Sequence, residues 1–113
     1  MPETYTQYTQ ELSATIGELR KDIPDVMKGF SAMASAALSE GALDKKTKEL
    51  IALSIGVTGH CKGCIGFHVK ALIALGISRE ELTEALGMAV YMGGGPSLMY
   101  AAEALQAFEE FSK

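Results

Sequence analysis

The sequence has little that favours β-structure and lacks the charge expected of a nucleic-acid-binding protein. Strictly alternating polar and apolar segments are scarce, whereas apolar residues at helical spacing are frequent. Ten lysines and arginines against fourteen aspartates and glutamates give a net charge of −4, and no basic stripe with interleaved aromatic residues occurs. We therefore expect an all-α protein that does not bind nucleic acid.

The sequence also lacks the patterns of a secretion signal and of a membrane span. Its amino terminus is polar, with no basic segment followed by an apolar run. The longest uncharged stretch, residues 85–102, is interrupted by Gly93-Gly94-Gly95-Pro96, whereas a spanning helix must keep its backbone hydrogen-bonded. We therefore expect no membrane partner and a cytoplasmic location.

Cysteine is rare, since only Cys61 and Cys64 are present. A chain of 113 residues, of which 48% are hydrophobic, can build one core without covalent cross-links. In a reducing compartment such a pair is more typical of redox or metal chemistry than of a structural disulfide. The two cysteines are therefore candidates for function.

The apolar spacing and the turn residues predict a single domain over residues 1–113 with about six helices. Pro24 is expected to begin one helix, Asp44 to cap the next, and Ser78 to form a capping box with Glu81. The glycine-rich segment 93–96 is expected to form an abrupt turn and no phosphate-binding loop. The expected helices cover about residues 4–20, 24–40, 45–57, 61–76 and 79–92, with a last helix from the glycine-rich turn to residue 111.

Several apolar segments are expected to be buried. The helix over residues 45–57 is apolar on nearly every side after its first turn, which is typical of a buried helix. Four of the six methionines lie in helical apolar patterns and are expected to be packed. Pocket or subunit-interface packing is the expected role of Tyr91, Met92, Met99 and Tyr100. For Tyr91 and Tyr100, core packing is favoured over lining a peroxide-binding cleft.

Two thiols and an imidazole lie close together from Cys61 onward. On a helix with about 100° per residue, Cys61, Cys64 and His68 fall within an arc of roughly 60°. A helix amino terminus stabilises a thiolate, and an imidazole four residues later is within reach of its proton. A thiolate that attacks a peroxide becomes a sulfenic acid, which a neighbouring thiol converts to a disulfide. The spacing therefore favours redox chemistry.

Two other interpretations of the same segment stay open. Cysteines on a helix often serve as small buried hydrophobic residues. His60, Cys61, Cys64 and His68 are also four candidate zinc ligands within nine residues. Structural zinc sites usually draw their ligands from two separated segments, so one short stretch would enclose the ion poorly. We therefore predict no metal and keep metal binding as an alternative.

A longer pattern surrounds the thiol segment. A glutamate, Glu49, lies twelve residues before the first cysteine of Cys61-x-x-Cys64-x-x-x-His68, and residues 49–53, 76–81 and 92–96 add further matching segments. With these features, about residues 24–108 resemble the alkylhydroperoxidase-like (AhpD-like) branch of the carboxymuconolactone decarboxylase superfamily. The resemblance implies an all-helical fold, usually assembled as trimers or hexamers, and an alkylhydroperoxidase activity of the peroxiredoxin type.

The resemblance also implies catalytic roles. Cys64 matches the cysteine that forms the sulfenic acid, and Cys61 matches the partner thiol that supplies a proton and closes the disulfide. His68 and Glu49 match the proton relay. From the residues alone, Glu49 would instead form an exposed ion pair with Lys45, four residues before it.

The sequence departs from the best-known members at two points. Gly63 stands where they carry a histidine immediately before the second cysteine. They also contain a sequence-related amino-terminal half, whereas this sequence has one copy, which is expected to complete its core and its pocket in a homo-oligomer.

The expected function is thiol-dependent reduction of a hydroperoxide. A thioredoxin-like or lipoyl-bearing dithiol protein is the expected reductant, because the sequence shows no flavin or nicotinamide site and we predict no cofactor. The alternative is an oligomeric redox switch, disulfide-exchange protein or metal-binding protein that uses the same two cysteines.

Overall fold

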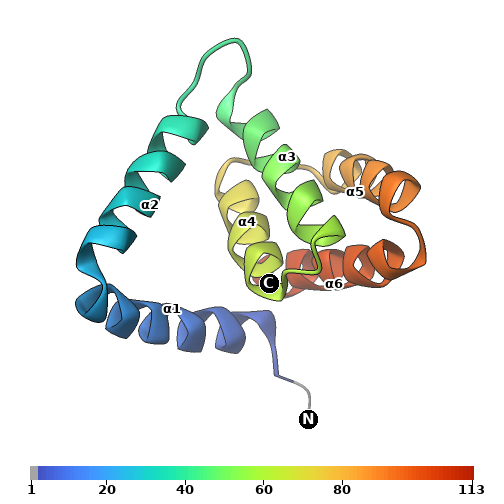
Figure 1. Ribbon diagram of the computed structural model, residues 1–113. Coiled ribbons are helices and arrows are strands. Elements are labelled where there is room, and N and C mark those ends of the chain that lie inside the picture. The colour runs from blue at the N-terminus through green and yellow to red at the C-terminus, as the bar shows by residue number, and fades with distance from the viewer. Residues whose placement is uncertain (1–2) are drawn as a thin grey trace.

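The structure is a computed structural model that describes residues 3–113 and contains six helices joined by short turns (Figure 1). The described residues form no β-strand, so the all-α prediction is confirmed. The helices are α1 (Tyr5–Asp22), α2 (Pro24–Leu38), α3 (Lys45–Thr58), α4 (Lys62–Ala74), α5 (Arg79–Gly93) and α6 (Gly95–Phe111).

Local signals set most of the helix ends. Pro24 is the first residue of α2, and the Asp44 side chain accepts a hydrogen bond from the backbone N–H of Thr47 at the start of α3. The glycine-rich segment forms the abrupt turn that was expected, because only Gly94 separates α5 from α6 and its φ of 76° lies in the left-handed region that favours glycine. The helix that was expected to start near Cys61 instead has Cys61 as its N-cap, in an extended conformation.

The core lies among α3, α4, α5 and α6. Its fully buried large side chains come from α3, α4 and α5, while α6 adds alanines that allow close packing. In Figure 1, α1 runs below this four-helix body and α2 rises along its left side. The large buried side chains are Leu53, Val57, Ile65, Val69, Leu72 and Leu82.

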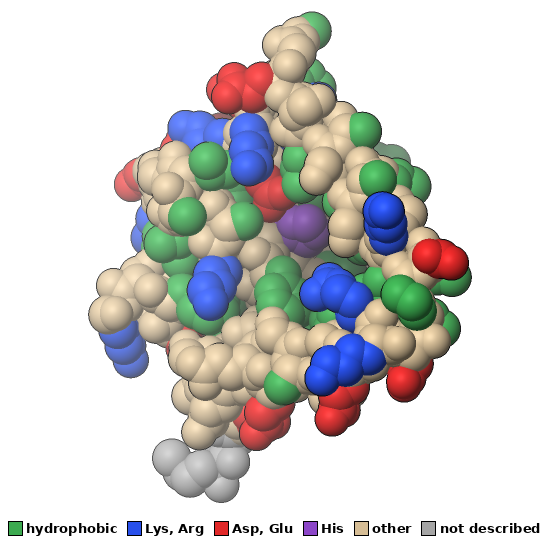
Figure 2. Space-filling model, turned by 90° about the vertical axis from the view of Figure 1, so that its left-hand side faces the viewer, with side chains coloured by type: hydrophobic (Ala, Val, Ile, Leu, Met, Phe, Trp, Pro, Cys, Tyr) green, Lys and Arg blue, Asp and Glu red, His purple; other side chains and the backbone are tan. Residues whose placement is uncertain are grey.

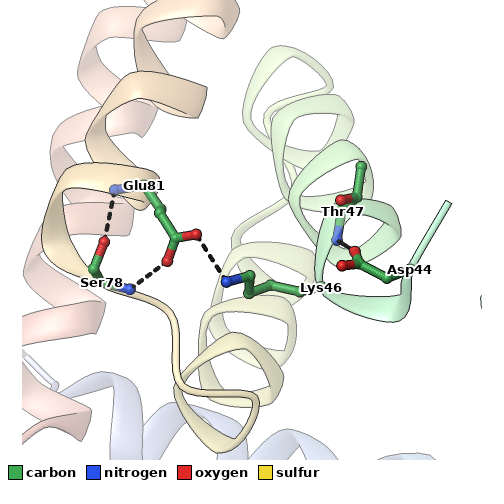
Figure 3. A network of polar contacts seen from close by, with 5 residues as sticks. All are labelled: Asp44, Lys46, Thr47, Ser78 and Glu81. Atoms are coloured by element: carbon green, nitrogen blue, oxygen red, sulfur yellow. Dashed lines mark hydrogen bonds and ion pairs between the residues drawn. The ribbon is translucent and has the colours of Figure 1, made fainter.

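A polar network joins the start of α3 to the start of α5 (Figure 3). Lys46 Nζ donates to Glu81 Oε2 at 2.8 Å, and Glu81 Oε1 accepts from the backbone N–H of Ser78 at 2.9 Å. The Glu81 backbone N–H in turn donates to Ser78 Oγ at 3.0 Å, which completes the predicted capping box. The Lys46 ammonium and the Ser78 N–H hold the pKa of the Glu81 carboxyl below its ordinary value.

Burial differs from the expectation in α3 and around the glycine-rich turn. Ile51 and Ile55 of α3 are exposed, and Tyr91 and Met92 remain 77% and 75% exposed in the single chain. The reason is geometric: one side of α3 packs on α4 and α5, while its other side faces two surface grooves. The predicted burial on every side is therefore wrong for one chain.

The methionines follow the same pattern. Met33, Met88, Met92 and Met99 are all exposed, so the expected packing of four methionines is not found within one chain. No described helix is both long and apolar enough to cross a membrane.

Candidate active site

Cys61 and Cys64 form a disulfide at the amino end of α4. The extended backbone of Cys61 turns its sulfur toward the helix, where Sγ accepts a hydrogen bond from the backbone N–H of Cys64 at 3.1 Å. The Cys61 N–H donates to the carbonyl oxygen of Gly56 in α3 at 2.9 Å. Both sulfurs are therefore held at a helix amino terminus, the position that favours a thiolate once the disulfide is reduced.

Gly56 allows α3 to lie directly against this disulfide. A Cβ atom at Gly56 would be 2.9 Å from Cys64 Cβ, which is too close for two carbon atoms. No motif in the sequence includes Gly56. Its position on the same face of the helix as Glu49 is the signal that could have found it.

Glu49 and His68 meet between α3 and α4. Glu49 is only 2% exposed, and its Oε2 lies 3.0 Å from His68 Nδ1. The exposed Lys45 ion pair expected from spacing is therefore wrong, because this face of α3 packs against α4 and not against water. A buried carboxylate is costly unless a donor pairs with it, and the imidazole is that donor.

The contact with a carboxylate sets which nitrogen of the imidazole donates. A carboxylate only accepts hydrogen bonds, so Nδ1 carries the proton that it donates to Glu49. The second nitrogen, Nε2, is then able to accept a proton. His68 lies one helical turn after Cys64, and the ring is 30% exposed. The arrangement places an imidazole nitrogen that can accept a proton one helical turn from Cys64.

His60 does not join this group. Its backbone has a φ of 57°, and its ring stacks on Tyr100 of α6 with the ring centroids 4.9 Å apart. The four candidate zinc ligands therefore do not converge on one point. Within residues 3–113 no group of three or more His, Cys, Asp or Glu side chains is arranged to hold a metal ion.

Helix α1 occupies the space beside Gly63. A Cβ atom at Gly63 would lie 2.9 Å from Leu12 Cδ2 and 3.9 Å from Tyr8 Oη. The neighbouring Lys62 ammonium lies 4.6 Å from the centre of the Tyr8 ring, within the range of a cation–π contact. Helix α1 thus covers Gly63, the position where the best-known relatives described above carry a histidine.

A groove between α2 and α3 reaches the site from outside. It has a volume of about 360 Å³ and is lined by alanine, leucine and isoleucine side chains together with Lys48 and His68. Figure 2 shows a histidine within a hollow on this side of the molecule, with an acidic side chain beside it and lysine or arginine side chains further out. The imidazole that contacts Glu49 therefore also forms part of the groove wall.

The sequence around this site matches a known protein family. Residues 24–107 match the model of the carboxymuconolactone decarboxylase family. The chain belongs to that family. The matched segment contains Glu49, Cys61, Cys64 and His68, whereas α1 lies before it.

Solved structures of this carboxymuconolactone decarboxylase family share the fold. A family protein from Legionella pneumophila, determined in its apo form, has a TM-score of 0.94 and 60% identity, covering 96% of this chain and 97% of that one. A second, from Thermotoga maritima, is described as having a possible role in an antioxidative response. It has a TM-score of 0.80 and 30% identity, covering 90% of each chain.

Curated relatives carry no assigned function. An uncharacterized protein from Cupriavidus necator is 36% identical over 99 residues, which covers 88% of each chain. An uncharacterized protein from Haemophilus influenzae is 34% identical over 104 residues and covers 92% of each. None of these names indicates a reaction.

Proposed function

We propose that this protein is a thiol-dependent hydroperoxide reductase that cycles Cys61 and Cys64 between dithiol and disulfide. One observation carries the proposal: a disulfide at a helix amino terminus lies one turn from an imidazole that a buried carboxylate holds. The antioxidative role suggested for the Thermotoga maritima relative supports the same direction.

In the first step the Cys64 thiolate attacks the hydroperoxide. Its proton has passed to Nε2 of His68, and Glu49 stabilises the resulting imidazolium. A sulfur–oxygen bond forms and the oxygen–oxygen bond breaks, which leaves a sulfenic acid on Cys64 and an alkoxide. The Cys61 thiol protonates the alkoxide to an alcohol and becomes a thiolate.

In the second step the Cys61 thiolate attacks the Cys64 sulfur. The disulfide forms, and the hydroxide that leaves takes the proton from His68 to become water. An external dithiol, borne by a thioredoxin-like or lipoyl-bearing protein, then reduces the disulfide by thiol–disulfide exchange. The balance is one hydroperoxide and one dithiol consumed for one alcohol, one water and one new disulfide.

The test is consumption of cumene hydroperoxide with dithiothreitol as the electron donor. The wild-type protein should turn over many times, and Cys64→Ser should fall to the rate of the free dithiol. With dithiothreitol left out, reduced Cys61→Ser should consume about one equivalent of hydroperoxide and hold a sulfenic acid that dimedone traps.

Two results would remove the proposal. One is a wild-type rate equal to that of free dithiol. The other is full turnover by Cys64→Ser. If the disulfide equilibrates with glutathione but peroxide is not consumed, the pair acts in disulfide exchange or as a redox switch.

A further inference from the structure

The groove between α2 and α3 combines an apolar wall with one cationic group. Of the side chains that line it, only Lys48 and His68 are polar, and no carboxylate is among them. The volume of about 360 Å³ falls within the range of small-molecule sites. A ligand that matches this lining is an alkyl chain with one negative charge.

Lys48 is fixed at one end of the groove. Its Nζ donates to the carbonyl oxygen of Ser39, just after α2, at 2.6 Å. An ammonium has three donors, so two remain for a ligand. Lys48, Ala52 and Ile55 follow one face of α3, and Ile55 lies about 10 Å further along the axis than Lys48. The apolar wall is therefore long enough for an extended alkyl chain that starts at the ammonium.

His68 brings the groove to the reacting groups. Its ring lines the groove, while Nδ1 binds Glu49 behind it and Cys64 precedes it by one helical turn. Further along the same helix α3, Gly56 touches Cys64. An alkyl chain held by its charged end at Lys48 would thus extend toward the end of α3 that contacts the disulfide.

We propose that the groove binds hydroperoxides of fatty acids, with the carboxylate on Lys48 and the chain along α3. The hydroperoxide group then lies toward His68 and Cys64. This inference rests on the proposed function for its reaction step, but the binding of the carboxylate and of the alkyl chain does not depend on it.

The first test compares two substrates that share the alkyl chain and the hydroperoxide but not the negative charge: linoleic acid hydroperoxide and its methyl ester. In the wild-type protein kcat/KM for the acid should exceed that for the ester by about tenfold, because one hydrogen bond to a charged group changes affinity by about that factor. Lys48→Met should bring the acid-to-ester ratio close to one. Lys70→Met removes an exposed lysine of α4 that does not line the groove, and it should keep the wild-type ratio.

The ratio separates binding from a structural role of Lys48. Lys48 also donates a hydrogen bond to the residue after α2, so its replacement could disturb the structure. A purely structural effect would lower kcat/KM equally for both substrates and leave the acid-to-ester ratio unchanged. A wild-type ratio of one, or an unchanged ratio in Lys48→Met, would overturn the inference.

A second test needs no turnover. Titration calorimetry should show that laurate, below its micelle-forming concentration, binds the disulfide form of the wild-type protein and binds Lys48→Met about tenfold more weakly. If cumene hydroperoxide is reduced but laurate does not bind, the inference fails and the proposed function stands. If laurate binds through Lys48 but no hydroperoxide is reduced, the proposed function fails and the fatty-acid site stands.

Discussion

At the scale of single residues, the Glu49–His68 contact connects the fold to the chemistry. Glu49 is enclosed between α3 and α4, and among residues 3–113 the hydrogen-bond donor that reaches its side chain is His68. Each residue therefore depends on the other: the carboxylate needs a donor, and the imidazole needs an acceptor that fixes its tautomer. This mutual dependence can be measured as a coupling energy.

Removal of the imidazole should cost stability because it leaves a buried carboxylate without a donor. We expect His68→Ala to lower the free energy of unfolding by about 1–3 kcal/mol. In the Glu49→Gln background the same change should cost clearly less, since an amide is cheaper to leave buried than a charge. Urea unfolding of the four proteins in the double-mutant cycle measures the difference. Strictly additive losses would show that the contact contributes nothing.

The sequence predicted some of these residues and not others. Pro24, Asp44 and Ser78 act on their own helix ends, so their roles follow from local spacing. The environment of Glu49 depends on which face of α3 meets α4, and Gly56 matters only because α4 approaches it. Contacts between helices are not encoded in the spacing within one helix.

At the level of the helices, α1 packs closely on α4 because α4 carries a glycine at the contact. Tyr5 and Thr9 of α1 are buried, and a Cβ atom at Gly66 would lie 2.6 Å from Thr9 Cγ2. The amino end of α1 is held by α6, because the Tyr5 hydroxyl donates to Glu103 at 2.7 Å. Burial and this carboxylate raise the pKa of Tyr5 well above its ordinary value, so the hydroxyl remains a donor. The helix that covers Gly63 is therefore held in place by buried contacts with α4 and by a hydrogen bond to α6.

Two glycine-to-alanine variants, one at the contact between α1 and α4 and one away from it, test this packing by their stability. Gly66→Ala should destabilise the protein by about 1–3 kcal/mol, because the added methyl group pushes Thr9 away. Gly29→Ala, in the middle of α2 with open space around its Cβ position, should instead stabilise by about 0.4–1 kcal/mol. Thermal unfolding under one buffer condition compares them. Equal effects of the two variants would contradict the packing of α1 on α4.

The network between α3 and α5 should give part of the stability a dependence on pH. The folded pKa of Glu81 lies below its ordinary value of 4.5, so its contribution is present above that pH and is lost as the pH falls through the folded pKa. Between pH 6 and pH 3, the Tm of Glu81→Gln should therefore fall by less than the Tm of the wild-type protein. The matched control is Glu84→Gln, an exposed carboxylate one turn later on α5, which should keep the wild-type slope. The same slope in all three proteins would contradict the account.

At the scale of the whole molecule, many large apolar side chains face outward. On α2, Val26, Phe30 and Met33 are 65%, 59% and 61% exposed, and α2 buries no residue in its own chain. They follow one face of α2 at i, i+4 and i+7 spacing, a pattern typical of an interaction surface. Their helical spacing marks one apolar face in the sequence, but spacing does not show whether that face packs within one chain or between chains.

We expect a homo-oligomer, a trimer or a hexamer, in which α2 is an interface element. Light scattering after size-exclusion chromatography should give three or six times the chain mass of 12.0 kDa. Phe30→Glu should shift the protein to smaller species, whereas Ser31→Glu adds the same charge at an exposed polar position and should not. A wild-type mass of 12.0 kDa at micromolar concentration would contradict this expectation.

In the proposed function, Cys61 and Cys64 carry electrons from a dithiol to a hydroperoxide. The most direct test is the intact mass of the fully reduced protein after one equivalent of cumene hydroperoxide, followed by alkylation of free thiols. Each chain should lose two hydrogens, take up no alkylating agent and give a peptide with a Cys61–Cys64 disulfide. Chains that remain doubly alkylated after hydroperoxide treatment would contradict it.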